Sequence, residues 1–191
     1  MPAELLRMML DGGLLQFGRF EKQGEIVPLV LALDLLPAYP EILRALIDEG
    51  AKLVGGWPER LLCTADAVPF AVGLSLQIGI PLVYSRGHPE QPVHDLVGAY
   101  DVGHPTLLIT QTLAPTAKLE QFINQAKKVG LDVQGVLAIT DGGASKGVFH
   151  DKPHGAQALI ALRDMVDQLE AEKALASGQA QAVRDWMGLT L

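Results

Sequence analysis

Residues 107–122 read LLITQTLAPTAKLEQF and give the clearest indication of the fold. Its apolar start runs into a short polar turn, and Pro115 then opens a segment with helical spacing. This order predicts a strand, a loop and a helix N-terminus, the arrangement whose free backbone N–H groups bind anions. The turn, however, has no glycine that would let a phosphate approach the backbone and no carboxylate that would hold a sugar or a magnesium ion. The outline of a phosphate site is present, and its usual side chains are absent.

Strands and helices alternate on both sides of this stretch. The predicted strands are 60–63, 82–85, 106–110 and 133–139, and the predicted helices include 68–77 and 115–129. Helical segments of about ten to fifteen residues between strands are typical of crossover connections, which join parallel strands. The sequence therefore predicts an α/β fold with a mostly parallel central sheet flanked by helices.

The N-terminal part of the chain adds three elements. We expect a helix over residues 5–10 that ends at Gly12-Gly13, a buried strand at 26–33, and a helix that begins at Pro40 and closes at Gly50. Glycine just after a helix and proline in its first turn are the usual end and start signals.

The C-terminal part begins with a glycine-rich loop after Asp141. Residues 157–162 fit a strand and a helix nearly equally well, and two helices follow at 164–175 and 178–187, the second capped by Ser177. At 191 residues the chain is long enough for one well-filled core, so we expect a single domain, 1–191.

Composition and charge restrict the classes of function. Hydrophobic residues make up 49% of the chain and charged residues 19%, which excludes a mainly disordered protein. The longest apolar runs fall well short of the roughly 18 residues that a membrane span needs, and no signal-peptide pattern opens the chain. The net charge of -7 disfavours a nucleic-acid partner. The one cysteine, Cys63, is expected to be buried and inert, and a single cysteine fits a reducing compartment. Taken together, these features predict a soluble, cytoplasmic protein.

A ligand site is expected at one edge of the predicted sheet. In parallel sheets, ligands bind where the carboxyl ends of the strands meet their loops. The candidate site is therefore built from the loops that follow Cys63, Ser85, Thr110 and Ile139.

Several motifs resemble those of the orotate phosphoribosyltransferases, a family with the type I phosphoribosyltransferase fold. FGRF at 17–20, then KQG at 22–24 and Pro28, is similar to the family's F-G-x-F and K-S-G-R-x-S-P segments. GIPLVYSR at 79–86 resembles its G-x-P-L-x-x-x-R motif, and LVG at 96–98 resembles the residues after its mobile catalytic loop. The resemblance implies a type I phosphoribosyltransferase-like fold with a small N-terminal hood at 1–36 and a core at 37–191.

The opening stretch resembles the family's loop for phosphoribosyl pyrophosphate (PRPP). In the family the strand leads into D-D-x-x-T-T-G-G-S, whose two acids hold the ribose hydroxyls and whose small residues wrap the 5-phosphate. Here the register is unbroken and neutral side chains replace the acids. The equivalent residues are Thr110, Gln111, Ala114, Pro115, Thr116, Ala117 and Lys118. The resemblance therefore implies a PRPP loop whose functional residues have been replaced.

The other loops also lack residues that bind anionic groups in the family. The pyrophosphate turn, which ends G-G-I-P or K-G-I-P in the family, is formed here by Ala65, Asp66 and Ala67, so a carboxylate stands where an anion would lie. Asp141 is followed by Gly142, where the family has the arginine that grips the orotate carboxylate. The lysines of the family's mobile loop are also missing.

Three cations are the other candidates for contact with an anion. Lys22 and Arg86 keep family positions, but surface charges without function explain them equally well. Lys118 lies at a predicted helix start, where a solvated first turn is favoured over anion binding. His150 and His154 have the spacing of a helical metal pair, but Pro153 lies between them, so no metal site is expected. The resemblance implies Mg²⁺ only if PRPP is bound.

These replacements decide the expected function. Two acid-to-neutral changes forfeit about 2–3 kcal/mol, roughly a hundredfold in affinity. We therefore predict an orotate phosphoribosyltransferase-like protein of nucleotide (pyrimidine) metabolism that is a non-catalytic, ligand-binding or regulatory homologue, with a phosphorylated small molecule as its ligand. The alternative is an active transferase that moves phosphoribose from PRPP to orotate or another nucleobase through a divergent site. The resemblance also implies a homodimer.

Overall fold

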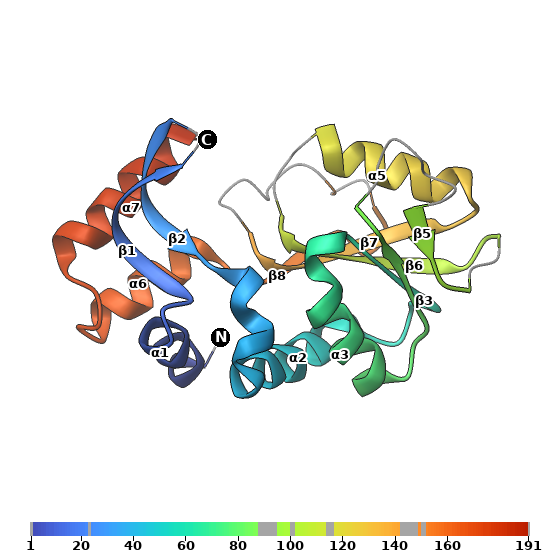
Figure 1. The fold of residues 1–191 in the computed structure, drawn as a ribbon, viewed down its shortest axis with the longest axis horizontal. Coiled ribbons are helices and arrows are strands. Elements are labelled where there is room, and N and C mark those ends of the chain that lie inside the picture. Colours follow the sequence, from blue (N-terminus) through green and yellow to red (C-terminus); the bar gives the residue numbers. More distant parts are fainter. Residues whose placement is uncertain are drawn as a thin grey trace.

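A six-stranded, mostly parallel sheet forms the centre of the computed structural model (Figure 1), which describes residues 2–22, 24–87, 95–99, 102–113, 117–141, 149 and 152–190. The strand order is β5-β4-β3-β6-β7-β8, and only the short edge strand β5 runs antiparallel to its neighbour. The strands are β3 (Arg60–Cys63), β4 (Leu82–Ser85), β5 (Leu96–Val97), β6 (Pro105–Thr112), β7 (Asp132–Thr140) and β8 (Ala156–Ile160). The predicted fold class is confirmed.

Helices cover both faces of this sheet, which is why its central strands read as continuous apolar runs. Helices α2 (Pro40–Val54) and α3 (Val68–Ile78) lie on one face, and α5 (Ala117–Lys128) lies on the other (Figure 1). Alternate residues of β6 divide between the two cores: Leu107 and Ile109 join the cluster with α2 and α3, whereas Leu108 packs with residues of α5. This alternation also decides which side chains at the strand ends face α5.

A second layer stands at the end of the sheet beside β8 (Figure 1). It contains the antiparallel hairpin of β1 (Leu15–Lys22) and β2 (Glu25–Leu31), with α1 (Ala3–Asp11), α6 (Leu162–Ala171) and α7 (Ser177–Thr190). Helix α7 contacts β2, and two short 3-10 turns, η1 (Leu33–Ala38) and η2 (Ala65–Ala67), complete the described elements. The N-terminal hood is thus packed against the C-terminal helices.

The N-terminal predictions need correction in three places. The strand expected at 26–33 is the shorter β2, and it is only partly buried because it belongs to a hairpin with one open side. Its partner β1 was missed, since its polar residues hide the strand pattern. The helix expected to close at Gly50 continues to Val54. Gly50 is buried inside α2, where an added Cβ would lie 2.9 Å from the ring of Phe70, so the glycine serves packing and not termination.

In the ambiguous segment 157–162, the first four residues belong to strand β8, which pairs in parallel with β7, and Leu162 already begins α6. The helix expected at 164–175 begins earlier and ends earlier, as α6, while α7 covers the predicted 178–187 and extends it. None of the described helices combines the length and the hydrophobicity that a transmembrane span requires.

Candidate functional site

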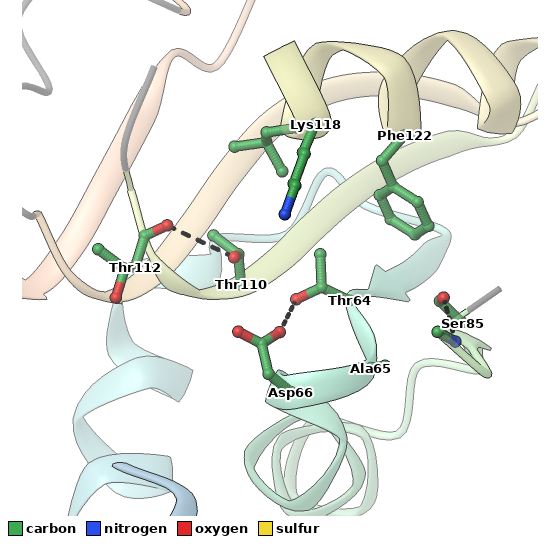
Figure 2. Close-up of a pocket in the computed structure, with 10 residues that line it drawn as sticks. Thr64, Ala65, Asp66, Ser85, Thr110, Thr112, Lys118 and Phe122 are labelled. Carbon is green, nitrogen blue, oxygen red and sulfur yellow. Dashed lines mark hydrogen bonds between the residues drawn. The ribbon is translucent and has the colours of Figure 1, made fainter. Parts of the chain in front are cut away.

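A cleft of about 410 Å³ opens at the carboxyl ends of β3, β4 and β6, under the first turns of α5 (Figure 2). Its described lining residues come from the loops after these strands and from the helix: Thr64, Ala65, Asp66, Ser85, Gly87, Thr110, Thr112, Lys118, Leu119 and Phe122. The position is the one expected for ligand binding in a parallel sheet. Of the predicted PRPP-loop and pyrophosphate-turn residues, Thr110, Lys118, Ala65 and Asp66 are brought together here.

Hydroxyl groups line the floor of the cleft. Thr64 follows β3, Ser85 ends the neighbouring β4, and Thr110 lies near the end of β6 on the other side of β3. Thr112, the last residue of β6, lies two residues beyond Thr110 on the same face. Side chains two residues apart on a strand share a face, so the pleat directs these groups toward α5. The Thr110 hydroxyl is buried and makes a long, 3.5 Å hydrogen bond to the backbone carbonyl of Thr112, whose own side chain is exposed.

Two opposite charges face the same space. Lys118 extends from the start of α5 toward Thr110 and Thr64, and the Asp66 carboxylate lies across from it (Figure 2). The hydroxyl of Thr64 donates a hydrogen bond to the Asp66 carboxylate, which holds that side chain at the rim. Among the described residues that line the cleft, these two side chains carry the only formal charges, and they cancel.

The buried end of the cleft is held by Ser85. Its hydroxyl donates to a carboxylate oxygen of Asp95 at 2.6 Å and accepts the backbone N–H of Gly87 at 2.9 Å. Asp95 is only 1% exposed, so this bond secures a buried acid next to the cleft. Ser85 therefore connects the end of β4 with Gly87 and Asp95.

Gln111 joins three segments next to the cleft. Its side-chain amide donates to the backbone carbonyl of Asp66 at 2.8 Å and to the carboxylate of Asp34 at 3.3 Å. The end of β6 is thereby tied to η2 and to η1. Gln111 does not line the cleft, so this predicted site residue has a structural contact in place of a ligand-binding position.

Cys63 directly precedes Thr64 of the cleft lining and belongs to the core on the opposite, α2 and α3 face of the sheet. Burial, together with the nearby negative charge of Asp66, raises the pKa of its thiol from 9.0 to about 12. The residue is fully buried in β3. The expectation of a buried cysteine is confirmed, and the raised pKa keeps the thiol protonated at neutral pH.

The remaining predicted residues lie elsewhere. Asp141 accepts the backbone N–H of Leu162 at 3.0 Å and so caps the start of α6. Lys22 at the end of β1 and Arg86 after β4 are exposed and do not line the cleft. Ala67 is the last residue of η2 and is buried, and Ala117 is exposed at the start of α5. Ala114, Pro115, Thr116 and Gly142 fall outside the described residues, as does His150.

Six of the ten described lining residues were not named as site residues from the sequence: Thr64, Ser85, Gly87, Thr112, Leu119 and Phe122. The signal for Thr112 was the period of two that places it beside Thr110. Helical spacing of 118, 119 and 122 would have brought the two apolar residues to the side of α5 that carries Lys118. Gly87 gave no comparable signal.

Comparisons with known proteins agree on the fold. No protein-family model matches the chain. It is 22% identical over 191 residues to the orotate phosphoribosyltransferase of Sulfolobus acidocaldarius, covering 96% of both chains. It is also 24% identical over 144 residues to a hypoxanthine/guanine phosphoribosyltransferase of Methanococcus maripaludis, covering 67% of this chain and 77% of that protein.

Solved structures match over nearly the whole chain. The UMP synthase of Leishmania donovani superposes with a TM-score of 0.83 at 23% identity, over 97% of this chain and 42% of that longer chain. The orotate phosphoribosyltransferase of Francisella tularensis gives a TM-score of 0.77 at 19% identity, over 96% and 97% of the two chains. The cleft and fold thus define a protein with the type I phosphoribosyltransferase-like architecture. Within that class, the chain resembles the orotate phosphoribosyltransferases.

The described part of the cleft offers one side chain that could contact a magnesium ion. Mg²⁺ is usually held by one or two carboxylates together with substrate phosphates. Asp66 supplies the one carboxylate that lines the described cleft, and it already accepts a hydrogen bond from Thr64. Within the described ranges, no group of three or more metal-ligating side chains is found.

Proposed function

We propose that this orotate phosphoribosyltransferase-like protein binds a small molecule in the cleft and does not transfer phosphoribose. The observation that carries the proposal is the Asp66 carboxylate, which faces the cleft from the turn that resembles the family's pyrophosphate turn. A phosphate charge about 5 Å from a carboxylate is opposed by about 3 kcal/mol at an effective dielectric constant of about 20. Solvent at the exposed rim reduces this figure, but its sign opposes a diphosphate.

The Gln111 contact supports the same proposal. The family resemblance implies a ribose-binding acid at this position, whereas Gln111 is engaged with Asp66 and Asp34 outside the cleft. A catalytic transferase must stabilise the charge on the departing pyrophosphate, and such electrostatic stabilisation usually supplies most of the rate enhancement. Lys118 is the one cation among the described lining residues, and Asp66 offsets it.

The direct test is an assay for transfer. Purified protein is incubated with PRPP, Mg²⁺ and orotate, hypoxanthine or guanine, and pyrophosphate release and nucleotide formation are both measured. We expect neither to exceed the protein-free rate, while the orotate phosphoribosyltransferase of Sulfolobus acidocaldarius serves as positive control. Formation of any nucleotide at a rate proportional to protein concentration would refute the proposal.

The second candidate is an active phosphoribosyltransferase with a divergent site. It is favoured by one observation: Lys118 extends into the cleft from the start of α5, where a phosphate could also meet helix N–H groups (Figure 2). It predicts thermal stabilisation by PRPP, since a ligand at a hundredfold excess over its dissociation constant adds about 2.7 kcal/mol to the free energy of unfolding. An unmoved melting curve at millimolar PRPP with Mg²⁺ would exclude it.

The homodimer implied by the resemblance is part of the proposal. Light scattering coupled to size-exclusion chromatography measures the mass directly, against 20.4 kDa for one chain. A monomeric mass at micromolar concentration would contradict the expectation.

A further inference from the structure

We propose that the cleft selects an uncharged, hydroxyl-rich ligand with one apolar face, the chemistry of a nucleoside or a free sugar, in preference to any phosphorylated molecule. The inference rests on the proposed function, because it takes the same cleft as the binding site. The sequence motif predicts a phosphorylated small molecule, whereas the side chains of the cleft favour an uncharged ligand.

The charge of the lining is the first argument. Lys118 and Asp66 oppose one another across the cleft, so the described lining has no net charge (Figure 2). The whole chain adds a further repulsive field for anions, with a net charge of -7. A diphosphate would need several more cations than this lining supplies, whereas an uncharged ligand would not disturb the balance of the pair.

The hydrogen-bonding capacity of the lining is the second argument. Each threonine hydroxyl can donate once and accept twice, which matches ligand hydroxyls that also do both. Thr64 uses its proton on Asp66, so its oxygen is left to accept from a ligand. An ionised carboxylate has about four acceptor positions, so Asp66 can receive further ligand hydroxyls beside Thr64. Thr112 is exposed at the other end of the row and can donate or accept.

The apolar wall is the third argument. Leu119 and Phe122 lie on the face of α5 that covers the cleft, and Phe122 keeps 8% of its surface exposed. Ala65 adds a methyl group at the opposite rim. An apolar wall above a polar floor suits a molecule with a C–H-rich or ring face on one side and hydroxyls on the other.

The size of the cleft agrees with this class. Its volume of about 410 Å³ lies in the range of small-molecule pockets, roughly 300–1,000 Å³. The cleft therefore has room for a sugar with an attached base, and also for a free sugar alone. A comparison of nucleosides with free ribose in a binding assay shows whether the ligand is a nucleoside or a free sugar.

The test is a binding panel on the full chain, by thermal shift and then titration calorimetry. The uncharged arm contains uridine, inosine, adenosine and ribose, and the charged arm contains PRPP, ribose 5-phosphate and pyrophosphate, each at up to 10 mM. We expect at least one uncharged compound to raise the melting temperature and to bind at least tenfold more tightly than every charged one. Tighter binding of any charged compound, or no shift with any uncharged compound, would overturn the inference.

Variants then locate the binding site. Thr64→Val and Thr112→Val remove hydroxyls without changing charge and should weaken the uncharged ligand about three- to tenfold each. Thr140→Val, which removes a hydroxyl on the neighbouring strand outside the cleft lining, is the matched control and should leave affinity unchanged. Asp66→Asn should weaken the uncharged ligand and strengthen pyrophosphate, so the two affinities move in opposite directions.

The outcomes separate the two proposals. Nucleotide formation from PRPP refutes the proposed function, whatever the panel shows. Preferential binding of pyrophosphate without transfer refutes only the ligand class. Unchanged affinity in all three cleft variants, each shown by circular dichroism to be folded, places the ligand elsewhere and overturns the inference.

Discussion

Replacement of Gln111 by alanine should lower the free energy of unfolding, because the side chain connects three segments of the chain. The change removes the hydrogen bonds to the Asp66 carbonyl at 2.8 Å and to the Asp34 carboxylate at 3.3 Å. A neutral hydrogen bond contributes about 0.5–1.5 kcal/mol, and the longer bond to an exposed carboxylate adds at most a similar amount. We expect a loss of about 1.5 kcal/mol. For a chain of this length, that lowers the melting temperature by about 3–6 °C.

Urea unfolding followed by tryptophan fluorescence measures this loss, since the chain has two tryptophans. Gln121→Ala is the matched control, because Gln121 is exposed on α5 and its replacement by a good helix former should change stability by less than about 0.5 kcal/mol. Gln111→Glu keeps the size, removes the donor and places a negative charge beside Asp34, so it should be less stable than Gln111→Ala. Wild-type stability in both Gln111 variants would show that the bridge contributes nothing and would refute the reasoning.

Three further changes test the packing and the buried groups. Gly50→Ala should cost about 1–2 kcal/mol in urea unfolding, because the new Cβ would lie 2.9 Å from the fully buried ring of Phe70. Gly178→Ala in α7, with no described atom within 4 Å, should be neutral or stabilising, and equal effects of the two changes would contradict this. The raised pKa of the Cys63 thiol contributes stability that is fully present below pH 9 and is lost as pH rises toward 12. The free energy of unfolding should therefore fall more between pH 8 and pH 10.5 in the wild type than in Cys63→Ala. An equal fall in both proteins would disprove the assignment. Thr140→Val should raise the free energy of unfolding by about 1 kcal/mol, since the Thr140 hydroxyl is buried without a hydrogen-bond partner among the described residues. A destabilised variant would show that this hydroxyl has a hydrogen-bond partner in solution.

The sheet could be predicted from sequence because its signals are local. Strands such as β6 are apolar runs separated by helical segments, and these patterns survive without knowledge of what packs against them. Gly50 was misjudged for the opposite reason: its partner Phe70 comes from another helix, and no local pattern shows that contact. Strand β1 was missed because one side of the hairpin faces solvent, which weakens the apolar signal.

The candidate site was predicted in position and only partly in detail. The loops after β3 and β6 were named because parallel strands place their carboxyl ends at one edge. Gln111, however, was assigned to the PRPP-loop equivalent, and its contacts with Asp34 and Asp66 depend on segments distant in sequence. The family resemblance placed Asp141 in the loop of the base site, whereas its side chain caps α6, 21 positions further along the chain. Side-chain direction was the missing information in both cases.

The packing of the hairpin against α7 has a consequence for synthesis of the chain. Gln179 of α7 contacts the backbone carbonyl of Phe17 in β1, and 162 positions separate these residues. At about 5–20 residues per second, a ribosome needs roughly 8–32 s to travel that distance. Throughout that interval the buried residues of β2, Val27 and Leu29, lack their final cover. The packing of β2 against α7 is therefore completed only after α7 has been synthesised, whereas the sheet and its crossover helices can begin to assemble earlier.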